Sequence, residues 1–339
     1  MAKSLVLRQP HMLRLEDREQ PPIPPGHLGI TVRRVGVCGT DYHAIQGTQP
    51  YFTYPRILGH EIAGVIADKD QAASPTWRVG QPVIVRPYLE CGTCIACRAG
   101  KPNCCVQLRV LGVHSDGGLT EYLVVPEDHV IDAEGLTWDQ AVAVEFLSIG
   151  YHAVRRAQVS AGEWVVVVGA GPIGLAVLAW CRLAGARTLA VDSDPDRRHL
   201  AHTWAGAETL ASGDPETLRG QIAMMTGGDL TPLVFDATGH PSVMRETPYL
   251  VAHGGRLVYV GLAQTDLVIS DPWFHEHEMT ILSSRNALAE DFLAVRDALL
   301  HGRLSVEPLI NDHVTLNEAP RVLQSPLDPK IIKRVIELS

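Results

Sequence analysis

The first part of the chain, from Lys3 to about Val144, alternates short apolar runs with polar residues and with Gly or Pro. Such runs indicate strands because they are short, rich in branched residues and bounded by turn formers. The runs are residues 29–35, 62–66, 81–85 and 122–125, preceded by a turn cluster at 21–26. We therefore expect a mostly antiparallel β domain.

The pattern changes in the middle of the chain, where continuous apolar runs alternate with helical stretches such as residues 175–183. Strands that are apolar on both faces are typical of a parallel sheet covered by helices on each side. The apolar runs are residues 164–168, 188–191, 233–235 and 256–260. This region predicts an α/β domain of residues 148–286.

The last part of the chain contains an amphipathic helix candidate at 290–301, a run at 306–314 and a strand-like run at 330–338. It is too short to form a domain of its own, and 339 residues favour two domains. We expect residues 287–339 to return and complete the first domain with residues 1–147.

Composition and charge narrow the classes of partner. The chain is 46% hydrophobic and 20% charged, which is typical of a globular protein, and its net charge is −9 with scattered basic residues. That charge disfavours nucleic acid. We find no signal-peptide pattern and no apolar run long enough to span a membrane, so we expect a cytoplasmic protein.

A glycine motif stands between a predicted strand and a predicted helix: Gly169-Ala170-Gly171-Pro172-Ile173-Gly174. In this context the first glycine allows a tight turn, the second lets a pyrophosphate approach the backbone, and the third lets helix and strand pack closely. The helix N-terminus then offers N–H donors and a positive dipole end to the phosphates. The motif predicts a dinucleotide site.

Asp192 ends the next predicted strand, at the spacing of the acid that binds the adenosine ribose. Its charge would repel a 2′-phosphate, which favours NAD over NADP. Arg197 and Arg198 follow closely and could bind that phosphate, so the preference stays open at this point. We also expect Arg197 and Thr238 to contact the cofactor.

Five of the seven cysteines lie between residues 91 and 105. An odd number so clustered is a poor disulfide framework and points to a metal. Cys91, Cys94, Cys97 and Cys105 offer four thiolates for a structural zinc, and Cys104 is left over. The spacing does not fit a bacterial iron–sulfur motif, and the polar surroundings argue against unligated core cysteines.

A second set of possible ligands is dispersed: Cys38, His60, Glu61 and Glu145. Taken singly, each has an ordinary explanation as a buried thiol, a hydrogen-bonded histidine or a solvated acid. Together they would form an open zinc site with a free position for an alcohol, whose pKa the metal would lower.

The order of these motifs is specific. The run from Gly36 to His43 (GVCGTDYH), then Gly59-His60-Glu61, then a cysteine lobe at about 88–108, then the glycine motif, resembles the zinc-containing medium-chain alcohol and polyol dehydrogenases over essentially the whole chain. The resemblance implies a GroES-like β-barrel catalytic domain and a doubly wound parallel Rossmann domain. It also implies two zinc ions per subunit, NAD, and homodimers or homotetramers formed through the cofactor domains.

The resemblance also implies residue roles. Cys38 and His60 would ligate the catalytic zinc directly. Glu61 and Glu145 would take the remaining positions, one of them through water or only in some states, and Glu145 resembles the sorbitol dehydrogenase branch. Asp41 would orient His60. Thr40 would accept the proton of the alcohol and pass it, through the nicotinamide ribose, toward His43.

The substrate is less strongly indicated. Polar residues expected near the cleft, including His114, Ser148 and Arg285, favour a sugar acid or polyol over a simple alcohol. Residues 49–55, 111–118 and 283–287 resemble bacterial sugar-acid dehydrogenases of the L-galactonate type. We hypothesise that Arg285 pairs with a substrate carboxylate. Arg285 as a solvated charge or a cofactor contact is the alternative.

Three other functions compete with this interpretation. A general polyol, secondary-alcohol or threonine-type dehydrogenase would share the metal and NAD sites. A non-catalytic, NAD-sensing zinc protein would bind NAD without turnover and would lack the second metal. A zinc-free quinone reductase would lack the cysteine lobe.

Overall fold

The computed structural model describes residues 1–338, and the chain divides into two compact units. The first unit combines Met1–Glu145 with the segment from Leu288 onward, and the second unit is Phe146–Ala287. The boundary between residues 145 and 146 lies within one helix, α3 (Trp138–Ala157).

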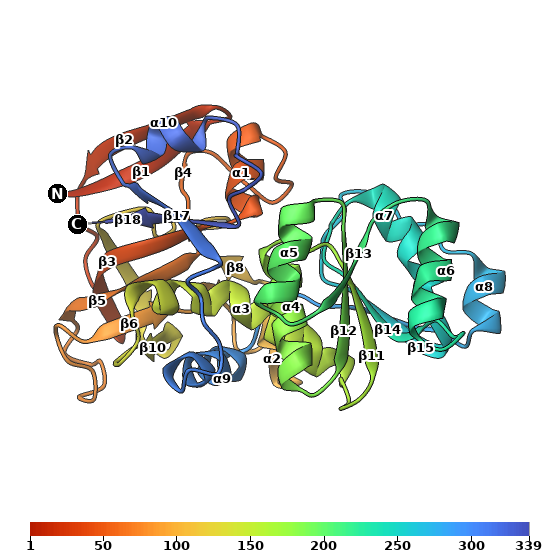
Figure 1. Ribbon diagram of the computed structural model, residues 1–339. Coiled ribbons are helices and arrows are strands. Elements are labelled where there is room, and N and C mark those ends of the chain that lie inside the picture. Colours follow the sequence, from red (N-terminus) through yellow and green to blue (C-terminus); the bar gives the residue numbers. More distant parts are fainter. Residues whose placement is uncertain (339) are drawn as a thin grey trace. The chain divides into compact units, whose positions relative to one another are not determined.

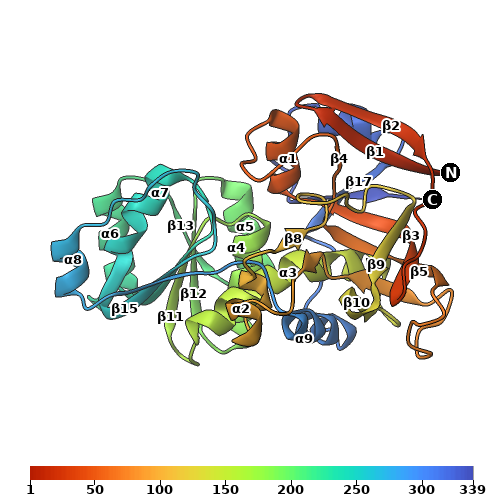
Figure 2. The same ribbon diagram turned by 180° about the vertical axis from the view of Figure 1, so that it is seen from behind.

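Antiparallel sheets dominate the first unit. A small sheet has the order β2-β1-β4, and a larger one has the order β10-β6-β5-β3-β18-β17 (Figure 1). Strand β9 also pairs with β3 (Figure 2). A further pair joins β7 and β8. The strands are β1 (Ala2–Gln9), β2 (Met12–Arg18), β3 (His27–Val37), β4 (Arg56–Ile57), β5 (Glu61–Lys69), β6 (Pro82–Val85), β7 (Tyr88–Leu89), β8 (Arg109–Val110), β9 (Tyr122–Pro126), β10 (Val130–Asp132), β17 (Ile310–Thr315) and β18 (Lys333–Glu337).

Short helices connect these strands. They are α1 (Gly39–Gln46), α2 (Ile95–Arg98), η1 (Pro102–Cys104), η2 (Glu127–His129), α9 (Ala289–Leu300) and α10 (Ala319–Leu323). The N-terminus of α1 is fixed by a capping box in which the Asp41 carboxylate accepts the N–H of Cys38 (2.9 Å).

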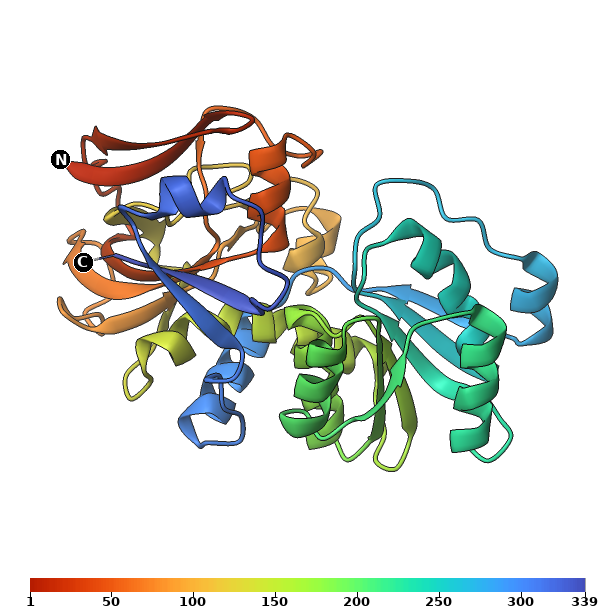
Figure 3. The ribbon, with the colours of Figure 1, turned by 45° about the horizontal axis from the view of Figure 1, so that its top comes forward.

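The long strand β3 organises the first unit because it pairs with β5, β9 and β18. Its apolar side chains, Leu28, Ile30 and Val32 among them, are fully buried in one core. The C-terminal strand β18 lies antiparallel to β3, with Arg334 opposite Val37. Figure 3 shows these dark-blue C-terminal strands among the red and orange N-terminal ones. Strands that lie about 300 residues apart in the sequence, β3 and β18, thus pair within a single sheet.

The second unit is a parallel sheet with the order β13-β12-β11-β14-β15-β16 (Figure 1). Its strands are β11 (Trp164–Val168), β12 (Arg187–Asp192), β13 (Glu208–Ala211), β14 (Thr231–Asp236), β15 (Val251–Tyr259) and β16 (Thr280–Ser283). The connecting helices are α4 (Pro172–Leu183), α5 (Pro195–Thr203), α6 (Pro215–Met225), α7 (Pro241–Glu246), η3 (Thr247–Leu250) and α8 (Asp271–Glu276).

Figure 1 shows α4 and α5 on one side of this sheet and α6 and α7 on the other. Both faces of β11 are therefore covered, which explains why Val165, Val166 and Val167 are fully buried. The strand order is that of the doubly wound dinucleotide-binding fold, and it confirms the predicted parallel domain. Among the described residues, no helix is long and apolar enough to cross a membrane.

Candidate functional site

Four cysteines gather in the lobe that follows β7. Their sulfur atoms lie within 4.8 Å of one another: Cys91, Cys94, Cys97 and Cys105. Backbone N–H groups of Cys97 and Val106 lower the pKa of Cys94 to about 6, whereas desolvation and the Cys94 sulfur raise the pKa of Cys97 to about 12. The neighbouring Cys104 is exposed and lies outside this group. Four convergent sulfurs fit a closed tetrahedral zinc site, which would order a lobe that has little apolar core.

A second group brings together Cys38, His60 and Glu61, one ligand atom of each lying within 4.8 Å of the others. Cys38 is the N-cap residue of α1, and His60 and Glu61 stand where β5 begins. In the β3–β5 ladder Gly36 lies opposite Glu61, and a Cβ at residue 36 would come within 2.0 Å of Glu61 Oε2. Glycine at this position therefore leaves the space that the Glu61 carboxylate fills.

The buried carboxylate of Asp41 joins the two segments that carry these ligands. It accepts the N–H of Cys38 (2.9 Å) and the N–H of Gly59 (3.2 Å), so it fixes α1 to the start of β5. Its Oδ1 lies 3.9 Å from His60 Nδ1, which is too long for a hydrogen bond. Asp41 thus holds the backbone that carries the ligands and makes no hydrogen bond to the His60 ring.

The second group fits a metal ion. His60 Nδ1 and Glu61 Oε2 are buried and find no hydrogen-bond partner among residues 1–338, a costly arrangement unless another group satisfies them. Burial lowers the pKa of His60, but Asp41 and Cys38 outweigh it and raise that pKa well above its usual value. The groups around His60 therefore favour a positive charge at this position. One sulfur, one imidazole and one carboxylate are the ligand types of an open zinc site.

Two buried partners, which the sequence did not reveal, hold the carboxylates of this site. Lys333 on β18 donates to Glu61 Oε1 (2.6 Å), and the Tyr88 hydroxyl donates to Glu145 Oε1. Burial raises the pKa of Glu145 to about 7, partly offset by His60. Glu145 is not part of the group formed by Cys38, His60 and Glu61 within the described residues.

Helix α1 carries a hydroxyl and an imidazole one turn apart. Thr40 Oγ1 lies 3.9 Å from Cys38 Sγ, and the exposed His43 has its Nδ1 3.2 Å from Thr48 Oγ1. Residues three apart lie on the same face of a helix, so Thr40 and His43 form a polar line from the cysteine toward solvent.

In the second unit the glycine motif forms the turn from β11 to α4. Gly169 has φ +91°, and a Cβ at Gly174 would lie 1.7 Å from the Gly169 carbonyl oxygen. A Cβ at Gly171, the N-cap of α4, would meet nothing within 4 Å, so the space in front of this backbone is open. The geometry agrees with the three different tasks of the glycines in a phosphate-binding turn.

Asp192 lies at the carboxyl end of β12, and its carboxylate is tied to the same turn. Its Oδ2 accepts the N–H of Ala170 (2.7 Å) and its Oδ1 accepts the N–H of Asp194 (2.8 Å). Arg197, in the first turn of α5, is half-buried. Thr238 follows β14, where its N–H (2.9 Å) and hydroxyl (2.6 Å) both donate to Asp236 Oδ1.

A cavity of about 530 Å³ opens at the carboxyl ends of β11 and β12. Its walls include Val168, Val191, Ser212, Gly213 and Val243. In doubly wound sheets this edge is where ligands bind. The cavity is therefore well placed for a flat, partly apolar ring next to the glycine turn.

Two comparisons with known proteins bear on this arrangement. Residues 24–135 match the alcohol dehydrogenase GroES-like domain, and residues 172–300 match the family described as zinc-binding dehydrogenase. Over 308 residues the chain is 41% identical to L-galactonate-5-dehydrogenase of Escherichia coli K12, covering 90% of this chain and 89% of that protein. The chain belongs to the zinc-containing medium-chain alcohol dehydrogenases.

Further similarities support this assignment. Starvation-sensing protein RspB of Escherichia coli K12 is 34% identical, covering 91% of this chain and 90% of that protein. The crystal structure of an alcohol dehydrogenase (rspB) from Escherichia coli CFT073, complexed with NADH, has a TM-score of 0.92 and 31% identity over 99% of each chain. The predicted GroES-like and Rossmann fold class is confirmed, and this medium-chain dehydrogenase is a zinc-dependent enzyme that acts on alcohols or polyols.

The residues proposed to bind substrate occupy different parts of this medium-chain dehydrogenase. In the first unit, His114 Nδ1 accepts the N–H of Val110 (3.1 Å), and its ring stacks on Tyr51 with centroids 6.3 Å apart. In the second unit, Ser148 is fully buried on α3, and Arg285 is exposed in the loop after β16. Their roles remain predictions.

Proposed function

We propose that this dehydrogenase oxidises a secondary hydroxyl of a sugar acid of the L-galactonate kind, transferring hydride to NAD. The 41% identity to an L-galactonate-5-dehydrogenase over nine-tenths of the chain carries the choice of substrate. The grouping of Cys38, His60 and Glu61 supports the chemistry, because it supplies three ligands and leaves room for a fourth.

The proposed reaction removes a hydride from the carbinol carbon and a proton from its oxygen. When bound, zinc would supply a Lewis acid that lowers the pKa of the substrate hydroxyl, and NAD would supply the hydride acceptor. Cys38, His60 and Glu61 would hold the metal, and Glu145 would lie beside it. Thr40 would accept the hydroxyl proton, and the exposed His43 would release it to solvent.

We propose NAD rather than NADP as the cofactor. The glycine turn would bind the pyrophosphate, with Pro172 and Ile173 beginning the helix behind it, and the cavity at β11 and β12 would hold the adenine. The Asp192 carboxylate would accept hydrogen bonds from the ribose and repel a 2′-phosphate. The crystallised relative with NADH bound supports the same choice.

Replacing Asp192 tests the cofactor proposal. We expect Asp192→Ala to lower the ratio of kcat/KM for NAD to kcat/KM for NADP by about tenfold, since one charged hydrogen bond contributes about 1.5 kcal/mol. The exposed neighbour Asp196→Ala, on the outer side of α5, is the matched control and should leave the ratio unchanged. An unchanged ratio in Asp192→Ala would exclude this carboxylate as the discriminating group.

A substrate panel tests the proposed substrate class. L-galactonate and related aldonates should support NADH formation, and the corresponding uncharged polyols should be at least about tenfold poorer in kcat/KM, because Arg285 would lose its carboxylate partner. Arg285→Lys, which keeps the charge but not the bidentate geometry, should narrow that gap. Equal turnover of polyols and aldonates would favour a general polyol dehydrogenase.

A further inference from the structure

Tyr88 contacts Glu145, and both its backbone and its ring are held by neighbouring residues. It lies on the two-residue strand β7 and is 2% exposed. Its hydroxyl donates to Glu145 Oε1. A hydroxyl that donates to one carboxylate oxygen restrains that oxygen and leaves the other unconstrained. The position of the Glu145 carboxylate therefore depends on where Tyr88 is held.

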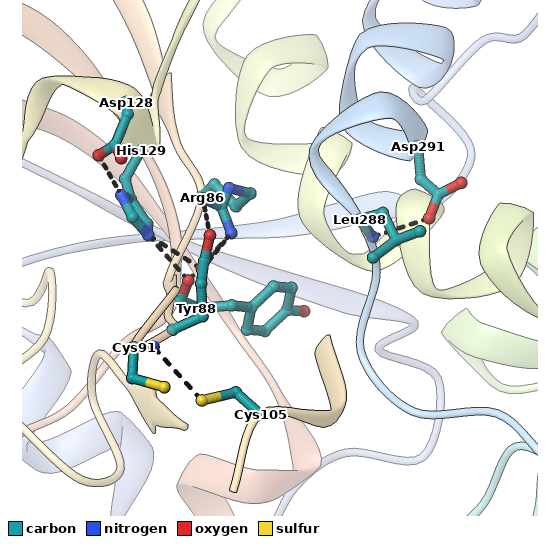
Figure 4. A network of polar contacts seen from close by, with 9 residues as sticks. Arg86, Tyr88, Cys91, Cys105, Asp128, His129, Leu288 and Asp291 are labelled. Atoms are coloured by element: carbon teal, nitrogen blue, oxygen red, sulfur yellow. Dashed lines mark hydrogen bonds and ion pairs between the residues drawn. The ribbon is translucent and has the colours of Figure 1, made fainter. Parts of the chain in front are cut away.

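The Tyr88 backbone is fixed by a network of charged residues. Its carbonyl oxygen accepts Arg86 Nη1 (3.0 Å) and lies 3.0 Å from His129 Nε2. Arg86 also binds Glu90 through two nitrogen–oxygen contacts of 2.9 and 3.1 Å. Figure 4 shows Arg86 and His129 converging on the Tyr88 backbone while the phenol ring points away from them. Bidentate pairs of this kind restrict motion as well as stabilise.

Packing fixes the ring itself. The Tyr88 ring meets the fully buried Phe292 of α9 edge-on, with centroids 6.0 Å apart and planes at 79°. Three residues further along, Cys91 begins the four-cysteine lobe, so the strand that carries Tyr88 is also anchored at that end. Neither the backbone nor the ring of Tyr88 can follow Glu145 if the carboxylate moves.

We propose that Tyr88 is a positioning residue whose hydroxyl holds Glu145 beside the Cys38–His60–Glu61 group and keeps it from ligating the catalytic metal directly. The three ligand atoms of that group are within 4.8 Å of one another, and Glu145 is outside the group while its Oε1 is bound by Tyr88. Holding the carboxylate at this place preserves an open position for the substrate oxygen. The inference rests on the proposed catalytic zinc but not on the proposed substrate.

Tyr88→Phe removes the hydroxyl and keeps the ring that packs on Phe292. The freed carboxylate would then move to the nearest cation and occupy the open position. In enzyme with cobalt at the catalytic site, we expect the visible d–d bands to shift, because a carboxylate would take the fourth position that is otherwise left for water or substrate. Release of metal to a chelator should slow, because an additional carboxylate ligand would have to dissociate before the metal leaves. The value of kcat/KM should fall.

Two further variants make the test specific. Tyr122→Phe removes a hydroxyl from a half-buried tyrosine of β9 in the same unit, and it should leave the spectrum and the release rate at wild-type values. In a Glu145→Gln background, Tyr88→Phe should no longer slow release, because the charge that moves is absent. A slower release that persists in that background would contradict the proposal.

The competing explanation is that Tyr88 only stabilises the fold. It predicts a lower Tm, faster metal release and an unchanged cobalt spectrum in Tyr88→Phe, and that result would overturn the proposal. These metal measurements need no sugar acid, so they decide the role of Tyr88 even if L-galactonate is not a substrate. A wild-type protein that binds metal only in the four-cysteine lobe would overturn this inference and the proposed function together.

Discussion

The two candidate zinc sites of this dehydrogenase are built in opposite ways. The lobe takes four identical ligands from residues 91–105, a single short stretch of chain. The catalytic candidate takes three chemically different ligands from residues 38, 60 and 61 and relies on Lys333, which is 272 residues from Glu61 in sequence. One site is local and uniform, and the other is dispersed and mixed.

This difference follows from what each site has to do. Four thiolates fill a tetrahedron and leave no position for a substrate, so such a site can only hold the chain together. A mixed set that leaves buried atoms such as His60 Nδ1 and Glu61 Oε2 without partners is stable only when the surrounding sheet enforces it. We therefore expect damage to the lobe to appear as lost stability and damage to the dispersed site to appear as lost catalysis.

The largest effect should come from Cys38→Ser. Serine is a poor zinc ligand at neutral pH, so the catalytic metal should be lost and kcat/KM should fall by at least about a thousandfold, equivalent to about 4 kcal/mol. Zinc analysis should then find one ion per chain in place of two, with Tm within a few degrees of wild type. Two retained zinc ions in an inactive Cys38→Ser protein would contradict the assignment of this ligand.

Cys104→Ser is the matched control for cysteine loss. Cys104 is exposed, stands next to Cys105 and is outside both groups of ligands. The variant should keep two zinc ions, wild-type kcat/KM and wild-type Tm. Loss of a zinc ion in this variant would mean that the lobe uses a different fourth sulfur.

The second largest effect should come from Cys97→Ser, in the lobe. Loss of one of four thiolates should destabilise the first unit by about 3 kcal/mol or more and lower Tm by roughly 6–12 °C, at the 2–4 °C per kcal/mol typical of domains this size. At a temperature where the variant stays folded, kcat should remain within about threefold of wild type. A thousandfold loss of kcat at unchanged Tm would contradict the claim that the lobe contributes to stability and not to catalysis.

The sequence predicted the second unit well because its strands are buried on both faces. Residues 164–168 were expected as a strand and form β11 with the same bounds, and the run at 188–191 lies inside β12. The edge strands β13 and β16 were missed. Their short, mixed runs are only partly buried, so no periodic signal marks them.

The two metal groups also differ in how much of each could be predicted from the sequence. The cysteine motif could be recognised from its spacing in the sequence, because four cysteines in one short stretch of chain also lie close together in the fold. The partners Lys333 and Tyr88 could not, since each acts through a contact that exists only after distant strands have paired, across 272 and 57 residues. Lys333 looked like an ordinary charged residue of a C-terminal strand, and only the register of β18 against β3 brings it to Glu61.

The smallest effect on the zinc-loaded protein is expected from Lys333→Met, which tests the surroundings of Glu61 in the dispersed site. Lys333 and Glu61 form an ion pair with side chains 3% and 1% exposed, so without metal the variant leaves a buried carboxylate unpaired at a cost of about 3 kcal/mol. With zinc bound, the metal supplies the missing positive charge. The cost should then shrink to about 1 kcal/mol, a Tm decrease of roughly 2–4 °C.

Thermal unfolding of the zinc-loaded and chelator-treated forms measures this difference directly. The gap in Tm between the two forms should be wider in Lys333→Met than in wild type, because in the variant only the metal offsets the charge of the Glu61 carboxylate. Lys333→Arg keeps the charge and should restore most of the wild-type gap. If Lys333→Met lowered Tm equally in both forms, Glu61 would be a structural partner of Lys333 alone, and the catalytic candidate would be reduced to Cys38 and His60.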